Sequence, residues 1–84
     1  MRTLVQSLSS LGRALRDARK RQGLNQSDLA LRAGVTQAMV SHAERGTRAL
    51  SIDTLLRLIA ALKLELVLQP REQSEAHARW RESQ

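Results

Sequence analysis

The sequence predicts an all-α fold, a bundle of four to five helices, followed by one C-terminal β-strand that pairs across a dimer. Apolar residues recur at helical spacing in four segments, and each segment begins near a Ser, Thr or Asn that can cap a helix. From Leu64 the spacing of the apolar residues changes from 3.6 to 2, which is the period of a strand. A chain of 84 residues is long enough for one small domain.

The first helix is predicted from apolar residues spaced i, i+3, i+4 and i+7, namely Leu11, Ala14, Leu15 and Ala18. Ser9 or Ser10 is expected to cap its start, and Gly23 is expected to end it. Four basic residues lie away from the apolar stripe and form a solvated face, from which one or two contact phosphates: Arg13, Arg16, Lys20 and Arg21.

Two short helices follow. Asn25 caps the second helix with Asp28 as its reciprocal partner, and Gly34 supplies the left-handed turn that ends it. Thr36 caps a third helix over residues 37–45, which Gly46 ends. The residues expected to face the core are Leu29, Ala30, Ala33, either Met39 or Val40, and Ala43.

Ser51 caps the fourth helix, which is the most hydrophobic part of the chain. The strand after it spans residues 64–69, with Leu64, Leu66 and Leu68 on one face, and Pro70 ends it. A strand needs a partner, and residues 3–6 are the only other segment that alternates even weakly. We therefore expect two copies of the chain to pair their strands in a homodimer, with the leucines of residues 52–68 as core and dimer seam.

The charge of the chain is positive and unevenly distributed. The 14 Lys and Arg exceed the 8 Asp and Glu, which gives a net charge of +6. All of this excess lies in residues 1–50, because residues 51–84 carry equal numbers of basic and acidic side chains. A polyanion is the expected partner of such a surface. With one Trp and no Phe or Tyr, the chain lacks the aromatic side chains on which a single-strand binder stacks bases, so we do not expect that mode of binding.

Other classes of function are excluded by what the sequence lacks. The chain has no Cys, and its His, Asp and Glu residues form no pattern typical of a metal site or of nucleophilic catalysis. We therefore expect no enzymatic activity, no cofactor and no small-molecule substrate. No apolar run is long enough for a membrane span or a secretory signal, so a cytoplasmic location is expected, on the nucleoid if the polyanionic partner is DNA.

The second and third helices have the arrangement of a helix-turn-helix. A short glycine-containing turn joins them, and each begins with a glutamine directly after its cap, Gln26 and Gln37. In this motif the second helix enters the major groove of DNA and carries short polar side chains to the base edges. The residues that fit this role are Thr36, Gln37, Ala38, Ser41 and His42.

Residues 10–63 resemble the Xre/phage-repressor-like (lambda-repressor-like) helix-turn-helix family. The resemblance rests on many coincident positions, among them Arg19, Gly23-Leu24, Gln26, Leu29-Ala30, Gly34-Val35, Gln37, Val40-Ser41, Glu44 and Gly46. The Leu-rich strand after the fourth helix and the late Trp of the tail are similar to HipB-type antitoxins, as is the fragment Gln37-Ala38-x-Val40-Ser41. Those antitoxins are dimeric DNA-binding partners of HipA-type Ser/Thr kinase toxins.

The resemblance implies a role for each matched residue. Gln37 reads a base, and Gln26 braces Gln37 and touches a phosphate. Arg19 pairs with Glu44 as a structural ion pair. Ser41 and His42 contact a base or a phosphate, and Ala38 contacts the methyl group of a thymine. Phosphates are contacted by Thr36, Arg45 and Arg48. For His42 a surface position without a function is an equal alternative.

These expectations divide the chain into an N-terminal arm (1–8), a helix-turn-helix DNA-binding domain (9–63), a dimerisation strand (64–69) and a mobile tail (70–84). Trp80 in the tail either anchors a protein partner or packs back onto the domain. The sequence thus predicts a sequence-specific dimeric repressor of a palindromic operator, which is also the antitoxin of a HipA-type kinase and autoregulates its operon. The alternatives are a free-standing Xre-type regulator without a toxin, and an inhibitory protein-interaction subunit that does not bind an operator.

Overall fold

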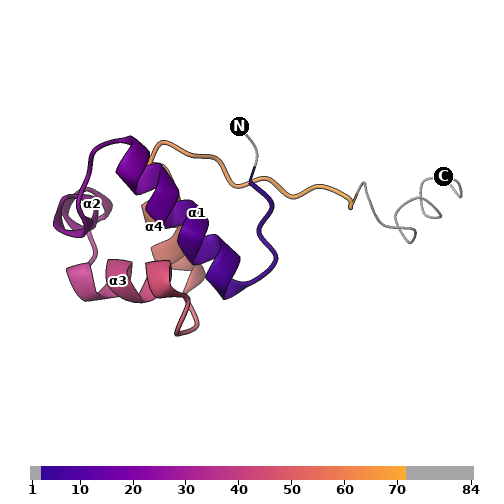
Figure 1. Ribbon diagram of the computed structural model, residues 1–84, viewed down its shortest axis with the longest axis horizontal. Helices are drawn as coiled ribbons and strands as arrows, with labels where there is room; N and C mark the ends of the chain where they lie inside the picture. The colour runs from indigo at the N-terminus through magenta and orange to yellow at the C-terminus, as the bar shows by residue number, and fades with distance from the viewer. Residues whose placement is uncertain (1–2, 72–84) are drawn as a thin grey trace, which may run out of the picture.

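A computed structural model describes residues 3–71, and within this range the chain forms four α-helices, α1 to α4 (Figure 1). Their bounds are Leu8–Arg21 for α1, Gln26–Ala33 for α2, Gln37–Arg45 for α3 and Ile52–Ala61 for α4. α1 packs against α3, and α2 packs against both α3 and α4. The predicted all-α helix-turn-helix bundle is confirmed, with four helices.

α1 begins at Leu8, which is earlier than the sequence predicted, and the expected cap at Ser9 or Ser10 is wrong. Ser7 is the N-cap: its Oγ accepts from the backbone N–H of Ser10 at 3.0 Å. In return, the N–H of Ser7 donates to Ser10 Oγ at 3.0 Å. The two serines therefore satisfy each other's orphan backbone groups, and Ser10 lies inside the helix as the partner of the cap.

The caps of the other three helices are as predicted. Asn25 Oδ1 accepts from the N–H of Asp28 at 2.7 Å, and Asp28 Oδ2 accepts from the N–H of Asn25 at 3.1 Å. Thr36 Oγ1 accepts from the N–H of Met39 at 3.1 Å, and Ser51 caps α4 in the same way. Gly34 ends α2 with φ of 70°, a conformation that costs a non-glycine residue energy. The turn between α2 and α3 is thereby fixed at its first residue.

The core lies where the inward faces of all four helices meet. Its largest fully buried side chains are Leu15, Leu29, Val40, Leu58 and Leu62. Val40 is completely buried, whereas Met39 remains 37% exposed, so Val40 is the core residue of the two that the sequence offered. The core of α3 is therefore formed by one side of the helix, and the opposite side stays open to solvent.

α1 and α3 approach each other closely at Gly12. A Cβ atom built on Gly12 would overlap the carbonyl oxygen of Glu44 and lie 2.6 Å from that of Ala43. Only a residue without a side chain fits at this crossing. The backbone of the third helix is thus held directly against the first, which restricts how α3 can tilt within the bundle.

The segment after α4 leaves the bundle. Leu62 caps the end of α4, its carbonyl oxygen accepts from Gln22 Nε2 at 2.6 Å, and Lys63 then turns the chain with φ of 57°. Residues 64–71 carry no regular secondary structure in this single chain and run away from the helices (Figure 1). Since the strand at 64–69 is expected to pair with a second copy, it stays a prediction.

Among the described residues, no helix has the length and apolar character needed to cross a membrane. Trp80 and the rest of the tail beyond residue 71 lie outside the described residues.

Candidate nucleic-acid interface

The solvent-facing side of α3 begins with two exposed residues, Gln37 and Ala38. Ser41 and His42, one turn later, are partly exposed, while Val40 and Ala43 are buried in the core. Thr36 is exposed and is occupied as the cap of α3. The residues predicted to meet DNA on α3 therefore lie on one polar side of a helix whose other side is fixed in the core.

A buried ion pair holds α3 to α1. Arg19 Nε donates to Glu44 Oε2 at 2.6 Å and Arg19 Nη2 donates to Glu44 Oε1 at 3.0 Å. The exposed fractions of the two side chains are only 10% and 4%, and Arg19 Nη1 also donates to the carbonyl oxygen of Leu24 at 2.8 Å. The hydrogen bonds to Glu44 raise the pKa of the Arg19 guanidinium above its ordinary value, although burial opposes this shift. The predicted structural pairing of Arg19 with Glu44 is confirmed.

Gln26 forms no hydrogen bond with Gln37, contrary to the expectation that it braces this residue. Its Nε2 atom donates to Glu44 Oε1 at 3.1 Å. The cause is the buried carboxylate of Glu44, because a charged acceptor attracts a nearby donor more strongly than a neutral amide does. Gln26 therefore ties the start of α2 to the last turn of α3, and Glu44 Oε1 accepts from two side chains.

Gln37 is contacted by Ser27, a residue that sequence reasoning missed. Ser27 Oγ donates to Gln37 Oε1 at 3.0 Å, between the first turns of α2 and α3. The only clue in the sequence is that Ser27 directly follows Gln26 after the same N-cap. That adjacency does not say which of the two side chains reaches Gln37.

The arginines at the end of α3 lie beside the same surface. Arg45 and Arg48 are both exposed, and Arg45 Nη2 lies 3.4 Å from His42 Nδ1. Arg48 also borders a shallow groove of about 230 Å³ with His42 and Met39. The loop after α3 thus places Arg48 next to the exposed side of that helix.

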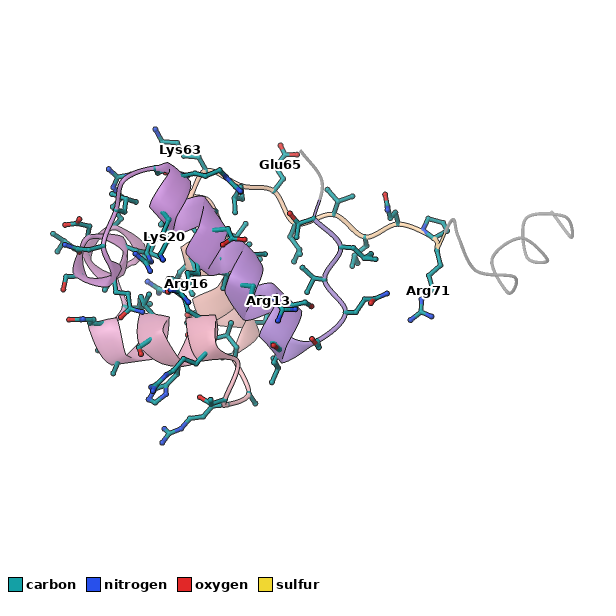
Figure 2. All side chains as sticks on the ribbon, viewed as in Figure 1. Arg13, Arg16, Lys20, Lys63, Glu65 and Arg71 are labelled. Atoms are coloured by element: carbon teal, nitrogen blue, oxygen red, sulfur yellow. The ribbon has the colours of Figure 1, made fainter. Side chains whose placement is uncertain are left out.

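Further basic side chains extend along α1. Figure 2 shows Arg13, Arg16 and Lys20 on this helix, and all three are exposed. The segment that leaves the bundle carries two basic residues and one acidic residue, Lys63, Arg71 and Glu65 (Figure 2). The positive charge of the described chain is therefore carried mainly by the helical bundle.

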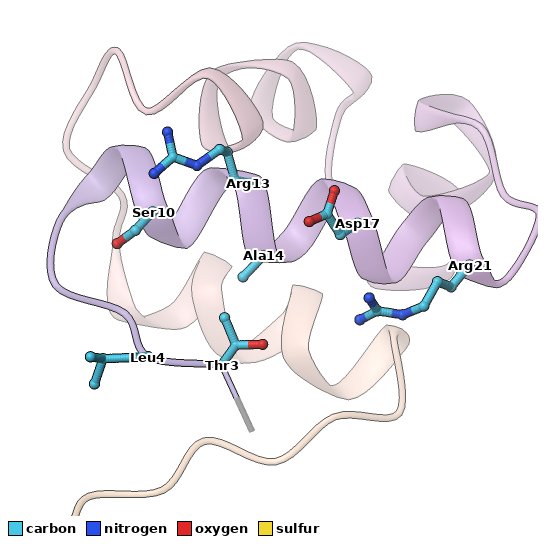
Figure 3. A pocket seen from close by; sticks show the side chains of 7 residues that line it. All are labelled: Thr3, Leu4, Ser10, Arg13, Ala14, Asp17 and Arg21. Carbon is cyan, nitrogen blue, oxygen red and sulfur yellow. The ribbon is translucent and has the colours of Figure 1, made fainter. Parts of the chain in front are cut away.

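A second groove, of about 220 Å³, lies between α1 and the chain that precedes it (Figure 3). It is lined by Thr3, Leu4, Ser10, Arg13, Ala14, Asp17 and Arg21. None of these residues is among those predicted to contact bases, and Asp17 lies between the two arginines along the helix. This groove does not concentrate charge of one sign and is separate from the surface of α3.

No group of three or more His, Cys, Asp or Glu side chains within residues 3–71 is arranged to hold a metal ion. The interface on α3 consists of amide, hydroxyl, imidazole and guanidinium groups. These groups suit hydrogen bonding to base edges and to phosphates.

Comparison with known proteins places this arrangement in a family. The helix-turn-helix family model HTH_3 matches residues 15–69. An uncharacterised HTH-type transcriptional regulator of Sinorhizobium fredii, y4dL, is 41% identical over 58 residues. The match covers 69% of this chain and 30% of y4dL, so the chain spans less than a third of that relative.

Solved structures give the same result. The restriction-modification controller protein C.AhdI from Aeromonas hydrophila is 38% identical with a TM-score of 0.66, over 69% of this chain and 88% of that one. HipB in a complex with an O4 20mer is 27% identical with a TM-score of 0.73, over 79% of this chain and 93% of that one. HipB is also similar in the HipA-HipB-O2-O3 complex, with a TM-score of 0.72 and the same identity and coverage.

The resemblance to Xre-type and HipB-type proteins is thus confirmed. The chain belongs to the helix-turn-helix family and carries an Xre-type domain of the kind found in transcriptional regulators.

Proposed function

We propose that this chain is a dimeric, sequence-specific repressor that inserts α3 into the major groove of a palindromic operator. The observation that carries the proposal is the division of α3 into a buried side and an exposed polar side that begins with Gln37. A major groove about 12 Å wide admits one helix, and the polar side of α3 presents short side chains suited to base edges.

The proposed contacts follow from residue chemistry and position. Gln37 hydrogen-bonds a base, and Ala38 offers its methyl group to a thymine. The phosphate backbone is contacted by Thr36 at the start of α3, by Gln26 at the start of α2, and by Arg45 and Arg48 near the end of α3. Ser41 and His42, in the middle of α3, contact bases or phosphates.

Dimerisation is supported by exposed apolar side chains outside the DNA-facing surface. Leu64, Leu66 and Leu68 are 38%, 53% and 94% exposed in the single chain. Ile52 and Leu56 on α4 are also exposed, at 68% and 48%. We propose that strands 64–69 of two copies pair about a two-fold axis, which separates the two α3 helices by about one turn of DNA, roughly 34 Å.

Charge supports duplex DNA as the partner. The net charge of +6 comes entirely from residues 1–50, which contain α1, α2 and α3. Neutralisation of phosphates by arginines releases counterions, so the affinity for any duplex should fall steeply as the salt concentration rises.

The more specific part of the proposal is that the protein is the antitoxin of a HipA-type Ser/Thr kinase and represses its own operon. The likeness to HipB covers 79% of this chain, and HipB is found in a complex with HipA, O2 and O3. The neutral C-terminal part leaves the basic surface available for DNA, and Trp80 is the proposed anchor for the toxin.

A second candidate is a regulator without a toxin partner. The restriction-modification controller C.AhdI favours it, since its identity of 38% exceeds the 27% of HipB. Purification of the protein from its native host, followed by identification of the bound proteins, separates the two. A bound kinase that is lost with Trp80→Ala supports the antitoxin. If no kinase is bound and no neighbouring gene encodes a kinase-like protein, the antitoxin role is ruled out.

Operator binding has its own test. Selection of duplexes from a random pool by the full chain should yield a palindrome with half-sites one helical turn apart. The selected sequence should also occur upstream of the protein's own gene. A pool that remains random after selection would exclude a sequence-specific repressor and would leave only an interaction subunit.

A further inference from the structure

Ser27 and Gln37 form a contact that directly affects the residue proposed to read a base. Both side chains are exposed, and Ser27 Oγ donates to Gln37 Oε1 at 3.0 Å. Ser27 belongs to the first turn of α2, and Gln37 is the first residue of α3. An exposed glutamine ordinarily samples many rotamers, so this contact restrains a side chain that would otherwise move freely.

Within residues 3–71, no other side chain is bonded to the Gln37 amide. Gln26, the neighbour of Ser27, is bound through Nε2 to Glu44, and Arg19 holds the Glu44 carboxylate with two hydrogen bonds. Gln26 therefore supports the packing of α2 on α3, whereas Ser27 supports the position of the Gln37 amide.

A hydroxyl bound to Oε1 leaves a defined set of hydrogen-bonding groups on Gln37. The carbonyl oxygen has two lone pairs and the NH₂ group has two N–H donors. Ser27 uses one lone pair, so the second lone pair and both donors remain available. Adenine in the major groove presents N7 as an acceptor and N6–H as a donor, which match these groups in pairs.

We propose that Ser27 is a positioning residue that orders the Gln37 amide before DNA is bound, so that Nε2 donates to adenine N7 and Oε1 accepts from adenine N6–H. The inference rests on the proposed insertion of α3 into the major groove. Its physical basis is preorganisation, because a side chain that is already ordered loses less conformational entropy on binding.

The contact is testable first in the free protein. The side-chain amide resonances of Gln37, assigned by their loss in Gln37→Ala, should shift in Ser27→Ala and narrow toward those of a mobile glutamine. Ser27→Thr keeps the hydroxyl and should retain the wild-type resonances. Identical Gln37 resonances in wild type and Ser27→Ala would overturn the proposal without reference to DNA.

The second test measures base preference on the selected operator. We expect Ser27→Ala to reduce the preference for adenine at the base pair read by Gln37 by about threefold to tenfold, the effect of one hydrogen bond. Ser27→Thr should restore it. In wild type, replacement of that adenine by 7-deazaadenine, which lacks the N7 acceptor, should reduce the affinity by a similar factor.

A double-mutant cycle with Gln37→Ala separates positioning from a direct contact between Ser27 and DNA. If Ser27 acts through Gln37, Ser27→Ala changes base preference only when Gln37 is present. An equal loss of affinity on all duplexes, with or without Gln37, means that Ser27 itself binds the backbone and the inference is wrong. If wild type selects no sequence at all, the proposed repressor function has failed rather than the role of Ser27.

Discussion

The guanidinium of Arg19 in α1 binds the carboxylate of Glu44 in α3 through two hydrogen bonds of 2.6 and 3.0 Å, and both side chains are buried. Glu44 Oε1 also accepts from Gln26 of α2. One carboxylate in the last turn of α3 therefore connects all three helices of the DNA-binding unit.

Removal of this carboxylate should destabilise the whole domain. We expect Glu44→Ala to lower the free energy of unfolding by about 3–5 kcal/mol, because the buried charge of Arg19 loses its partner. Chemical denaturation followed by circular dichroism measures the change. Asp53→Ala is the matched control, since Asp53 and Arg57 form an exposed pair at 2.9 Å and its loss should cost less than about 1 kcal/mol. Equal effects of the two substitutions would contradict the structural role of Glu44.

The crossing of α1 and α3 at Gly12 gives a second prediction. Gly12→Ala should destabilise the protein by about 1–3 kcal/mol, because the added methyl group meets the carbonyl oxygens of Ala43 and Glu44. Alanine is otherwise the better helix former, so a stabilised variant would show that the helices are farther apart. Arg13→Ala, on the exposed side of the same helix, should change the stability by no more than about 0.5 kcal/mol.

Gln37→Ala tests the base-reading role. The variant should lose about 1–3 kcal/mol of discrimination between the operator and duplexes altered at the contacted base pair. It should keep weak, salt-sensitive binding to any duplex, because the arginines remain. Gln6→Ala removes an exposed glutamine amide that precedes α1 and should leave discrimination unchanged. A footprint of Gln37→Ala identical to that of wild type would mean that another residue reads the base.

The dimer prediction concerns the segment after α4. Deletion of residues 64–69 should yield monomers in sedimentation experiments and should weaken operator binding, because two half-sites are then no longer bound together. Leu66→Lys should have the same effect with less disturbance of the chain. Gln69→Lys adds the same charge in the same segment and should remain dimeric. A dimeric deletion variant would place the seam elsewhere, and the exposed Ile52 and Leu56 of α4 would be the next candidates.

The sequence predicts a feature of this structure well when the residues that determine it are close together in the chain. The caps at Asn25, Thr36 and Ser51 are local features, and the sequence predicts them because the capping side chain and its backbone partner lie three residues apart. The start of α1 is predicted wrongly because two serines, Ser7 and Ser10, form the cap together. A prediction that considers one capping residue at a time does not identify Ser7 as the N-cap.

The partners of the glutamines were beyond sequence reasoning. Arg19 and Glu44 were paired through the family resemblance, although 25 positions separate them. No comparable rule assigns Gln26 to Glu44 or Ser27 to Gln37, since differences of about an ångström in helix packing decide which donor reaches which acceptor. The strand at 64–69 is a different case, because its partner belongs to a second molecule.

The hydrogen bond from Gln22 Nε2 to the carbonyl oxygen of Leu62 has a consequence for the DNA that such a dimer tolerates. It ties the end of α1 to the end of α4. The backbone N–H groups of Lys63 and Leu64 also donate to the carbonyl oxygens of Ala60 and Ile59, both at 3.0 Å, so rotation between the bundle and the pairing segment is confined to the residues after Leu64. One base pair added between the half-sites turns one of them by about 34° around the DNA axis. With so few residues available to follow that rotation, the spacer between half-sites should have a single permitted length.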